Sequence, residues 1–289
     1  MKDSIIIQRK GFYTTIQDKG RFGYASIGVP ESGAMDRKAL LLANALVNNL
    51  ENEAVLEYTL VGPTIQFQCD RHFVITGGIT IAMLDKKTIR NNTVYLAHKG
   101  QTLELTKIIE GCRGYVAIAG GIQSSSVLGS KSLYVPITDL GYIRESIEVP
   151  VGVSLYGRAK GARIKTGEKT GVGSYIHENS IKVYKGPEYD LLTPNIHKYL
   201  IETSFLVSKL WNRMAIHLEQ KIHHTIPTII TGPVIPGTIQ LTPLGHMMIL
   251  MKDCQTTGGY PRILQLSEHA MDILAQKKQG DTFSFLLTD

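Results

Sequence analysis

The sequence predicts a mainly β protein. Most of its 289 residues fall in short apolar or alternating runs, separated by turns that contain Gly, Pro or Asn. Only three segments have the apolar spacing or the capping residues of a helix. Residues 222–251 contain no Asp, Glu, Lys or Arg, but four prolines and three glycines interrupt any helix there. Buried β-structure is therefore the better interpretation of this uncharged segment.

The expected strands are short runs rich in β-branched, aromatic and other apolar residues, each bounded by turn residues. In chain order they are 72–77, 94–97, 102–108, 114–120, 181–184, 214–218, 228–231, 247–251, 262–266 and 282–287.

We expect three helices between these strands. The segment 34–48 carries apolar residues at helical spacing, with Asp36 in its first turn. The segment 268–278 follows Ser267, a good N-cap, and ends before Gly280. A shorter helix is expected to begin at Thr193-Pro194, with proline in the first helical position.

The glycine-rich, weakly patterned segment 157–174 is the best candidate for a domain boundary. We place the division near residue 178, which gives an N-terminal domain of residues 1–178 and a C-terminal domain of residues 179–289.

The charge pattern argues against nucleic acid as a partner. The formal net charge is +6, but the basic residues are scattered, with no run longer than a pair such as Lys86-Lys87. The N-terminus has only three consecutive apolar residues and no cleavage pattern, so we expect no signal peptide, no membrane partner and a cytoplasmic location.

The sequence also argues against a metal site and a self-contained nucleotide site. Its three cysteines are widely spaced and form no CxxC, and His223-His224 are adjacent rather than at ligand spacing. It contains no HExxH, no GxSxG and no Walker A sequence.

The richest group of polar side chains follows the apolar run 247–251. Asp253, Gln255, Thr256, Thr257 and Tyr260 offer donors and acceptors of several geometries within one loop hinged by two glycines. Polar groups fixed at the end of a rigid strand are typical of binding sites. The alternative is a polar hairpin turn without a ligand.

A second group lies in residues 14–36, where Asp18 and Arg21 flank Gly20 in a segment with four glycines. A tight turn there would hold a carboxylate and a guanidinium near one substrate, or would be a surface turn with a local ion pair. Arg213 lies before the expected strand 214–218 and either clamps an anionic group or is an ordinary surface arginine.

These segments together resemble one known family. The shared motifs are QDKGRFGY and GVPESGAMD in residues 17–36, LEYTLVGP at 56–63, AIAGGI at 117–122, KVYKGPEYD at 182–190, NRMAIHLE at 212–219 and VIPGTIQ with ILMKDCQTTGGYP in residues 234–261. The family comprises KipA, the C-type subunit of 5-oxoprolinase and allophanate hydrolase subunit 2, and includes part of the biotin-dependent carboxyltransferase region of urea carboxylase.

The resemblance implies two cyclophilin-like β-barrel domains and a multi-subunit assembly. The implied partners are a KipI-like protein (the B-type subunit of 5-oxoprolinase) and the A-type subunit, which together with the C-type subunit open 5-oxoproline to glutamate with ATP hydrolysis. One alternative is transfer of a carboxyl group from carboxybiotin to an amide substrate. Another is a KipA-like regulator that binds a KipI-like kinase inhibitor and has no catalytic activity.

The resemblance and the polar groups together suggest one cleft shared by both halves of the chain. Its expected catalytic residues are Asp253, Arg213 and Asp18, with Arg21 or Arg213 holding an anionic substrate group. The expected substrate-binding residues are Arg21, Gln255, Thr256, Thr257, Tyr260 and Gln240.

The chain departs from the family pattern in several places, which leaves the substrate open. The segment 140–154 lacks the family's Gly-Asp pair. Ala215 and Gln220 replace glycines, and Thr242 and Met247 replace prolines.

Overall fold

The computed structural model describes residues 3–138, 143–153 and 175–288. The chain forms two compact units. The first comprises Met1–Arg21 and Ser32–Ile176, and the second comprises Phe22–Glu31 and His177–Asp289. The glycine-rich segment 157–174, on which the expected boundary depends, lies outside the described residues.

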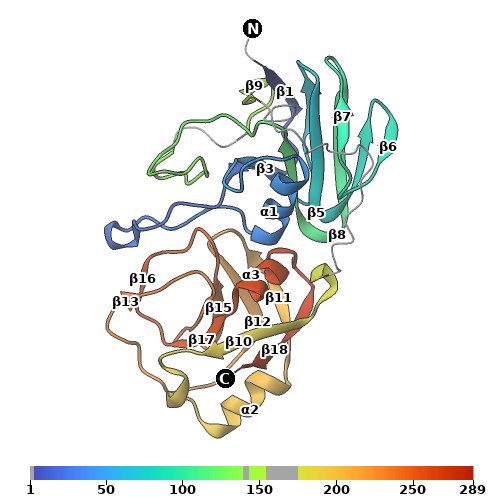
Figure 1. Cartoon of the computed structure of the whole chain (residues 1–289). Coiled ribbons are helices and arrows are strands. Elements are labelled where there is room, and N and C mark those ends of the chain that lie inside the picture. Colours follow the sequence, from blue (N-terminus) through green and yellow to red (C-terminus); the bar gives the residue numbers. More distant parts are fainter. Residues whose placement is uncertain (1–2, 139–142, 154–174, 289) are drawn as a thin grey trace. The chain divides into compact units, whose positions relative to one another are not determined.

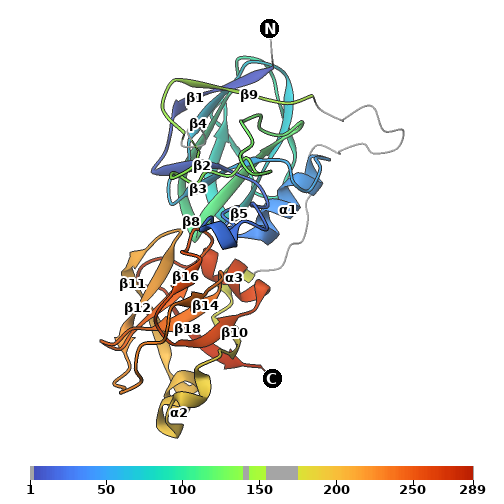
Figure 2. The same ribbon diagram turned by 90° about the vertical axis from the view of Figure 1, so that its left-hand side faces the viewer.

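The first unit is built on a curled antiparallel sheet (Figures 1 and 2). Its strands are β1 (Ser4–Arg9), β2 (Tyr13–Gln17), β3 (Val55–Thr59), β4 (Thr64–Phe67), β5 (Arg71–Leu84), β6 (Lys87–Ile89), β7 (Tyr95–Ala97), β8 (Thr102–Ile118) and β9 (Ile147–Pro150). The main path runs β2-β3-β8-β4-β1-β9, and β5 pairs with β6, β7 and β8. Strands β2 and β9 end this path, so the sheet is a half-barrel around a core that includes Ile5, Phe67 and Phe73.

Helix α1 (Arg37–Leu46) packs on β5 and β8 of this sheet (Figure 2). It begins three residues later than the expected helix 34–48 because Asp36 is its N-cap: the Oδ1 atom of Asp36 accepts a hydrogen bond from the Ala39 amide at 2.8 Å. The buried face of the helix includes Leu40 and Ala43, as the apolar spacing predicts.

The second unit is a closed seven-stranded barrel (Figure 1). Its strands, in order around the barrel, are β10 (Ser180–Lys185), β17 (Arg262–Leu266), β14 (Thr238–Leu241), β15 (His246–Leu250), β12 (Ala215–Lys221), β11 (Ser204–Trp211) and β18 (Thr282–Leu287). The parallel pairing of β10 with β18 closes the circuit. Closure leaves no free edge in this barrel, which makes it a rigid frame for the loops between its strands.

Two helices and one short ribbon complete the second unit. Helix α2 (Pro194–Glu202) begins at the expected proline, capped by Thr193, and packs on β18. Helix α3 (Glu268–Ala275) is capped by Ser267, whose Oγ accepts from the Ala270 amide, which confirms the predicted cap. Strands β13 (Gly232–Pro233) and β16 (Thr257–Gly258) form the ribbon.

The mainly β fold class is confirmed, with two corrections to its strands. The expected strands 102–108 and 114–120 form one continuous strand, β8. The expected strand 228–231 is wrong, because Pro227 and Pro233 flank the run and Ile230 is 95% exposed, so the run has no buried face to pair and pack. In the described part of the chain, no helix combines the length and the apolar character that crossing a membrane requires.

Candidate functional site

A two-point ion pair anchors the predicted loop to the barrel of the second unit. The Nε and Nη2 atoms of Arg213 donate to Oδ2 and Oδ1 of Asp253 at 2.7 and 3.0 Å. The Asp253 amide also donates to the Arg213 carbonyl oxygen at 2.8 Å. The pair is only slightly exposed, with side-chain values of 8% and 15%. It therefore fixes the turn after β15 against the turn that precedes β12.

Two glutamine side chains connect this loop to strand β14. Gln240, on β14, is fully buried; its Nε2 donates to the Tyr260 carbonyl oxygen, and its Oε1 accepts from Nε2 of Gln255, both at 3.3 Å. Gln255 is itself exposed, so a buried glutamine orients an amide group at the surface. Glycine at position 258 leaves room for the Gln240 side chain, because a Cβ atom there would lie 2.5 Å from Nε2 of Gln240.

The remaining polar residues of the loop are held by the ribbon β13–β16. The Val234 amide donates to the Thr256 carbonyl oxygen at 3.0 Å, and Thr257 pairs with Pro233. The backbone of both threonines is thereby fixed, while the Thr257 and Tyr260 side chains remain exposed. The loop is thus a surface of hydroxyl and amide groups on a rigid backbone, which suits recognition of an amide.

Lys252 and Glu31 add opposite charges at the start of this loop. Their Nζ and Oε2 atoms are 3.6 Å apart, and Glu31 comes from the segment Phe22–Glu31 of the second unit. Burial raises the pKa of the neighbouring Cys254 thiol to about 12, with a further contribution from the negative charges of Glu31 and Asp253. Cys254 is therefore protonated at neutral pH and unsuited to act as a nucleophile.

Asp18 and Arg21 lie in the first unit, and both are 1% exposed. Oδ1 of Asp18 accepts hydrogen bonds from Ser130 Oγ, Ser132 Oγ and the Gly20 amide at 2.6, 2.6 and 2.8 Å. Its Oδ2 accepts from the Lys131 amide at 2.6 Å, and Arg21 donates to the Ser132 carbonyl oxygen. The Asp18 carboxylate consequently fixes the segment 130–132 onto the loop after β2.

A buried acidic network connects the start of α1 to the sheet. Oε2 of Glu57 accepts hydrogen bonds from the Met35 amide at 2.8 Å and from the Tyr115 hydroxyl at 2.9 Å. Oδ2 of Asp36 accepts from the Tyr175 hydroxyl at 2.5 Å. Burial, together with the charges of Glu57 and Asp36, raises the pKa of Tyr115 well above its usual value. Tyr115 therefore stays protonated as a hydrogen-bond donor within the network.

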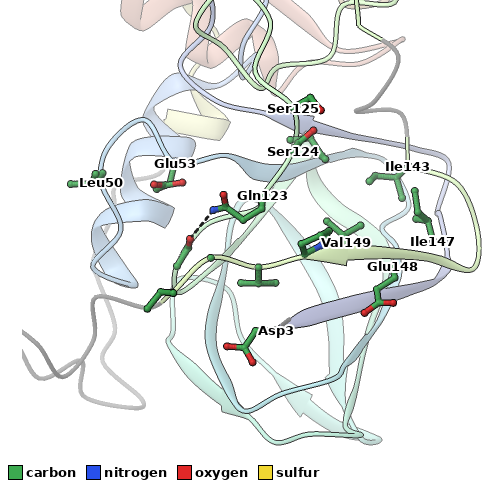
Figure 3. Close-up of a pocket in the computed structure, with 16 residues that line it drawn as sticks. Asp3, Leu50, Glu53, Gln123, Ser124, Ser125, Ile143, Ile147, Glu148 and Val149 are labelled. Atoms are coloured by element: carbon green, nitrogen blue, oxygen red, sulfur yellow. Dashed lines mark hydrogen bonds between the residues drawn. The ribbon is translucent and has the colours of Figure 1, made fainter. Parts of the chain in front are cut away.

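A cavity of about 990 Å³ lies in the first unit, along β9 and the loop that follows β8 (Figure 3). Three carboxylates lie on its wall, and each has a partner: Asp3 pairs with Arg71, Glu53 with Lys131 and Glu148 with Ser4. Ile147 and Val149 supply apolar surface from β9. No residue predicted for the site lines this cavity.

The structure places seven of the nine predicted site residues in the second unit. Arg213 binds Asp253, and Gln240 binds Gln255 and the Tyr260 carbonyl oxygen. Thr256 and Thr257 are held by the ribbon β13–β16. Asp18 and Arg21 form a separate cluster in the first unit, and the cleft that would join the two clusters stays a prediction. Throughout the described ranges, no group of three His, Cys, Asp or Glu side chains is placed to hold a metal ion.

Sequence reasoning missed the cavity and the Lys252–Glu31 pair. The cavity combines residues from 3 to 153, and no local pattern marks such a combination. Lys252 stands next to Asp253, but its partner is more than two hundred positions away in the sequence.

Comparisons with known proteins cover nearly the whole chain. The family described as "Carboxyltransferase domain, subdomain A and B" matches residues 27–287. The chain is 33% identical over 286 residues to the C-type subunit of 5-oxoprolinase from Escherichia coli, covering 97% of this chain and 90% of that protein. It is 42% identical over 132 residues to urea amidolyase of Saccharomyces cerevisiae, covering 45% of this chain and 7% of that protein.

The fold has a solved counterpart. The crystal structure of TTHA0988 superimposes with a TM-score of 0.87 at 22% identity, covering 99% of this chain. This chain spans only 56% of the length of TTHA0988, about half of that polypeptide. At this identity the similarity establishes the fold alone.

Proposed function

The chain belongs to the carboxyltransferase-domain family of subdomains A and B, and we propose that it is the C-type subunit of a 5-oxoprolinase-like complex. The observation that carries this proposal is the match to the C-type subunit of 5-oxoprolinase, which covers at least nine-tenths of both proteins. In the proposed reaction, the complex opens the lactam ring of 5-oxoproline to give glutamate, with hydrolysis of ATP.

The loop chemistry suits the proposed substrate. Ring opening adds water to the lactam carbonyl carbon, breaks the carbon–nitrogen bond and leaves the nitrogen protonated. The lactam presents one C=O acceptor and one N–H donor, which the Gln255 amide and the Thr256 and Thr257 hydroxyl groups can pair. Asp253, held by Arg213, is the proposed orienting or proton-handling carboxylate of this group.

ATP is the co-substrate of the proposed assembly rather than a ligand assigned to this chain. The sequence contains no Walker A motif, so it offers no place for the phosphates of ATP on this chain. The proposed partners are an A-type subunit and a KipI-like B-type subunit, to which we assign the ATP-dependent step.

The test is reconstitution of the three-subunit complex. This chain is purified together with its A-type and B-type partners, and glutamate formation from 5-oxoproline is measured with and without ATP. We expect glutamate only when all three subunits and ATP are present. A properly assembled complex that forms no glutamate would contradict the proposal.

Carboxyl transfer is the second candidate function. It is favoured by the family description and by the 42% identity to urea amidolyase over 132 residues. The amide side chain of Gln255 can pair with a ureido group as well as with a lactam, so the loop fits biotin, which would carry the carboxyl group to an amide nitrogen.

Discharge of carboxybiotin separates the two enzymatic candidates. The complex is incubated with radiolabelled carboxybiotin and small amides, and label transferred to the amide is counted. Transfer without glutamate formation supports the second candidate. If neither reaction occurs, but the chain relieves a KipI-like inhibition of a kinase, the protein is a regulator of the KipA type.

A further inference from the structure

The ammonium group of Lys252 is partly enclosed but is not hydrogen-bonded within the described residues. Its side chain is 17% exposed, and its ion pair with Glu31 spans 3.6 Å between Nζ and Oε2. A charge-assisted hydrogen bond between these atoms would be about 2.7–2.9 Å long. All three donors of the ammonium group therefore remain available to water or to a ligand.

The two arginines nearest to this loop in the sequence, unlike Lys252, are hydrogen-bonded to carboxylates. Arg213 is bound at two points by Asp253. Arg262, which follows the loop, is bound at two points by Glu188, with Nε–Oε2 at 3.0 Å and Nη2–Oε1 at 2.8 Å. Lys252 is thus a cation of this loop that has a carboxylate at ion-pair distance but, among the described residues, no hydrogen bond to it.

Lys252 is also close in the sequence to the residues proposed to bind an amide. Asp253 follows Lys252 directly in the chain, and Glu31 lies 3.6 Å from the Lys252 ammonium group, so the start of the loop carries one cation and two carboxylates. Gln255 follows three residues after Lys252 and presents its side-chain amide at the surface. A cation and a surface amide therefore come from the same short segment of the chain.

We propose that Lys252 binds the carboxylate of the substrate and that Glu31 is its exchangeable counter-ion. The identity of the ligand, a small lactam bearing a carboxylate, rests on the proposed function. In the ligand-free protein, Glu31 holds the ammonium group near the loop; in the complex, the substrate carboxylate forms the short hydrogen bonds that Glu31 does not. Lys252 is then a specificity residue that selects anionic over neutral lactams.

The experiment measures binding to the assembled complex without ATP, by calorimetry. Two ligands with the same ring are compared: 5-oxoproline, which is an anion, and 5-oxoprolinamide, which is neutral. We expect Lys252→Met to weaken 5-oxoproline binding about 10- to 100-fold and to leave 5-oxoprolinamide unchanged. Lys252→Arg should retain part of the affinity for the anion, because the positive charge remains.

Two further variants test the role of Glu31 and control for the loss of a lysine charge. Glu31→Gln removes the competing carboxylate and should strengthen 5-oxoproline binding about two- to fivefold. Lys278→Met is the matched control, because Lys278 also forms a 3.6 Å ion pair, with Asp281, but lies outside the loop. This control should bind both ligands as the unmodified complex does.

The outcomes for this inference and for the proposed function are separable. The inference is overturned if Lys252→Met binds 5-oxoproline normally, if it weakens both ligands equally, or if the unmodified complex binds neither ligand. The proposed function depends on glutamate formation by the unmodified complex. Lys252-dependent binding without glutamate formation would retain the inference and reject the function.

Discussion

Arg213 and Asp253 form a two-point ion pair, with Nε–Oδ2 at 2.7 Å and Nη2–Oδ1 at 3.0 Å. The pair joins the turn before β12 to the loop after β15, and the backbone hydrogen bond from Asp253 to Arg213 reinforces the connection. Both charged groups are mostly withdrawn from water. The guanidinium that the sequence suggested as an anion clamp therefore has a carboxylate of the same chain as its partner.

Arg213→Lys should destabilise the second unit by about 1–3 kcal/mol, because an ammonium group cannot reproduce the two parallel hydrogen bonds. Urea denaturation followed by the fluorescence of Trp211, the single tryptophan of the chain, reports on this unit. The control Lys198→Met removes an exposed ion pair and should change stability by less than about 1 kcal/mol. Equal stability of the two variants would show that the Arg213–Asp253 pair does not anchor the loop.

Gly258→Ala should disturb the glutamine pair while the barrel remains folded. The new Cβ atom would lie 2.5 Å from Nε2 of Gln240, so the end of that flexible side chain must move and release Gln255. We expect a loss of affinity for the amide substrate of up to about tenfold, with a stability change near 1 kcal/mol. Calorimetric titration and thermal unfolding measure the two quantities.

The neighbouring glycine provides a matched control. A Cβ atom on Gly259 would meet nothing closer than the Ile229 carbonyl oxygen at 3.6 Å, an ordinary van der Waals distance. Gly259→Ala should therefore bind substrate normally. A similar defect in both variants would argue for general loop stiffening rather than for displacement of Gln240.

Asp18→Asn should destabilise the first unit by about 2–3 kcal/mol, because an amide NH₂ would face hydrogen-bond donors on one side of the former carboxylate. Circular dichroism during urea denaturation measures the loss. Glu51→Gln, at a side chain that is 77% exposed, should change stability by less than about 0.5 kcal/mol. A stable but inactive Asp18→Asn variant would instead support the catalytic role that the sequence suggests.

The lowered pKa of Glu188 predicts that part of the free energy of unfolding is lost in acid. The hydrogen bond from Arg262 lowers the pKa of Glu188 below 4.5, the ordinary value that applies to the unfolded chain. The contribution is therefore fully present above pH 4.5 and is lost as the pH falls through the lower pKa of the folded state. The difference in unfolding free energy between the unmodified protein and Glu188→Gln should be largest above this pH and should shrink below it. Urea denaturation at several pH values from about 3 to 7 checks this, and a pH-independent difference would contradict it.

Local sequence patterns predicted much of the fold because their physical causes are local. Ser267 and Thr193 cap the helices that follow them, and the expected strands 262–266 and 282–287 match β17 and β18. The prediction failed at 228–231, where strand propensity is high but no partner strand or core covers the residues. A strand forms only where its residues pair with a neighbouring strand and pack against other side chains. The β-propensity of a short segment gives no information about those neighbours.

In the candidate site too, local features were predictable from the sequence and long-range contacts were not. The order of residues was enough to predict that the loop 252–261 is polar, hinged by glycine and placed after a buried strand, because each of these properties belongs to a short segment. The folded barrel was needed to establish that Arg213 pairs with Asp253, that buried Gln240 orients Gln255, and that Lys252 meets Glu31. These contacts join residues between 15 and 221 positions apart, and they depend on the folding of the second unit, which brings distant segments of the chain together.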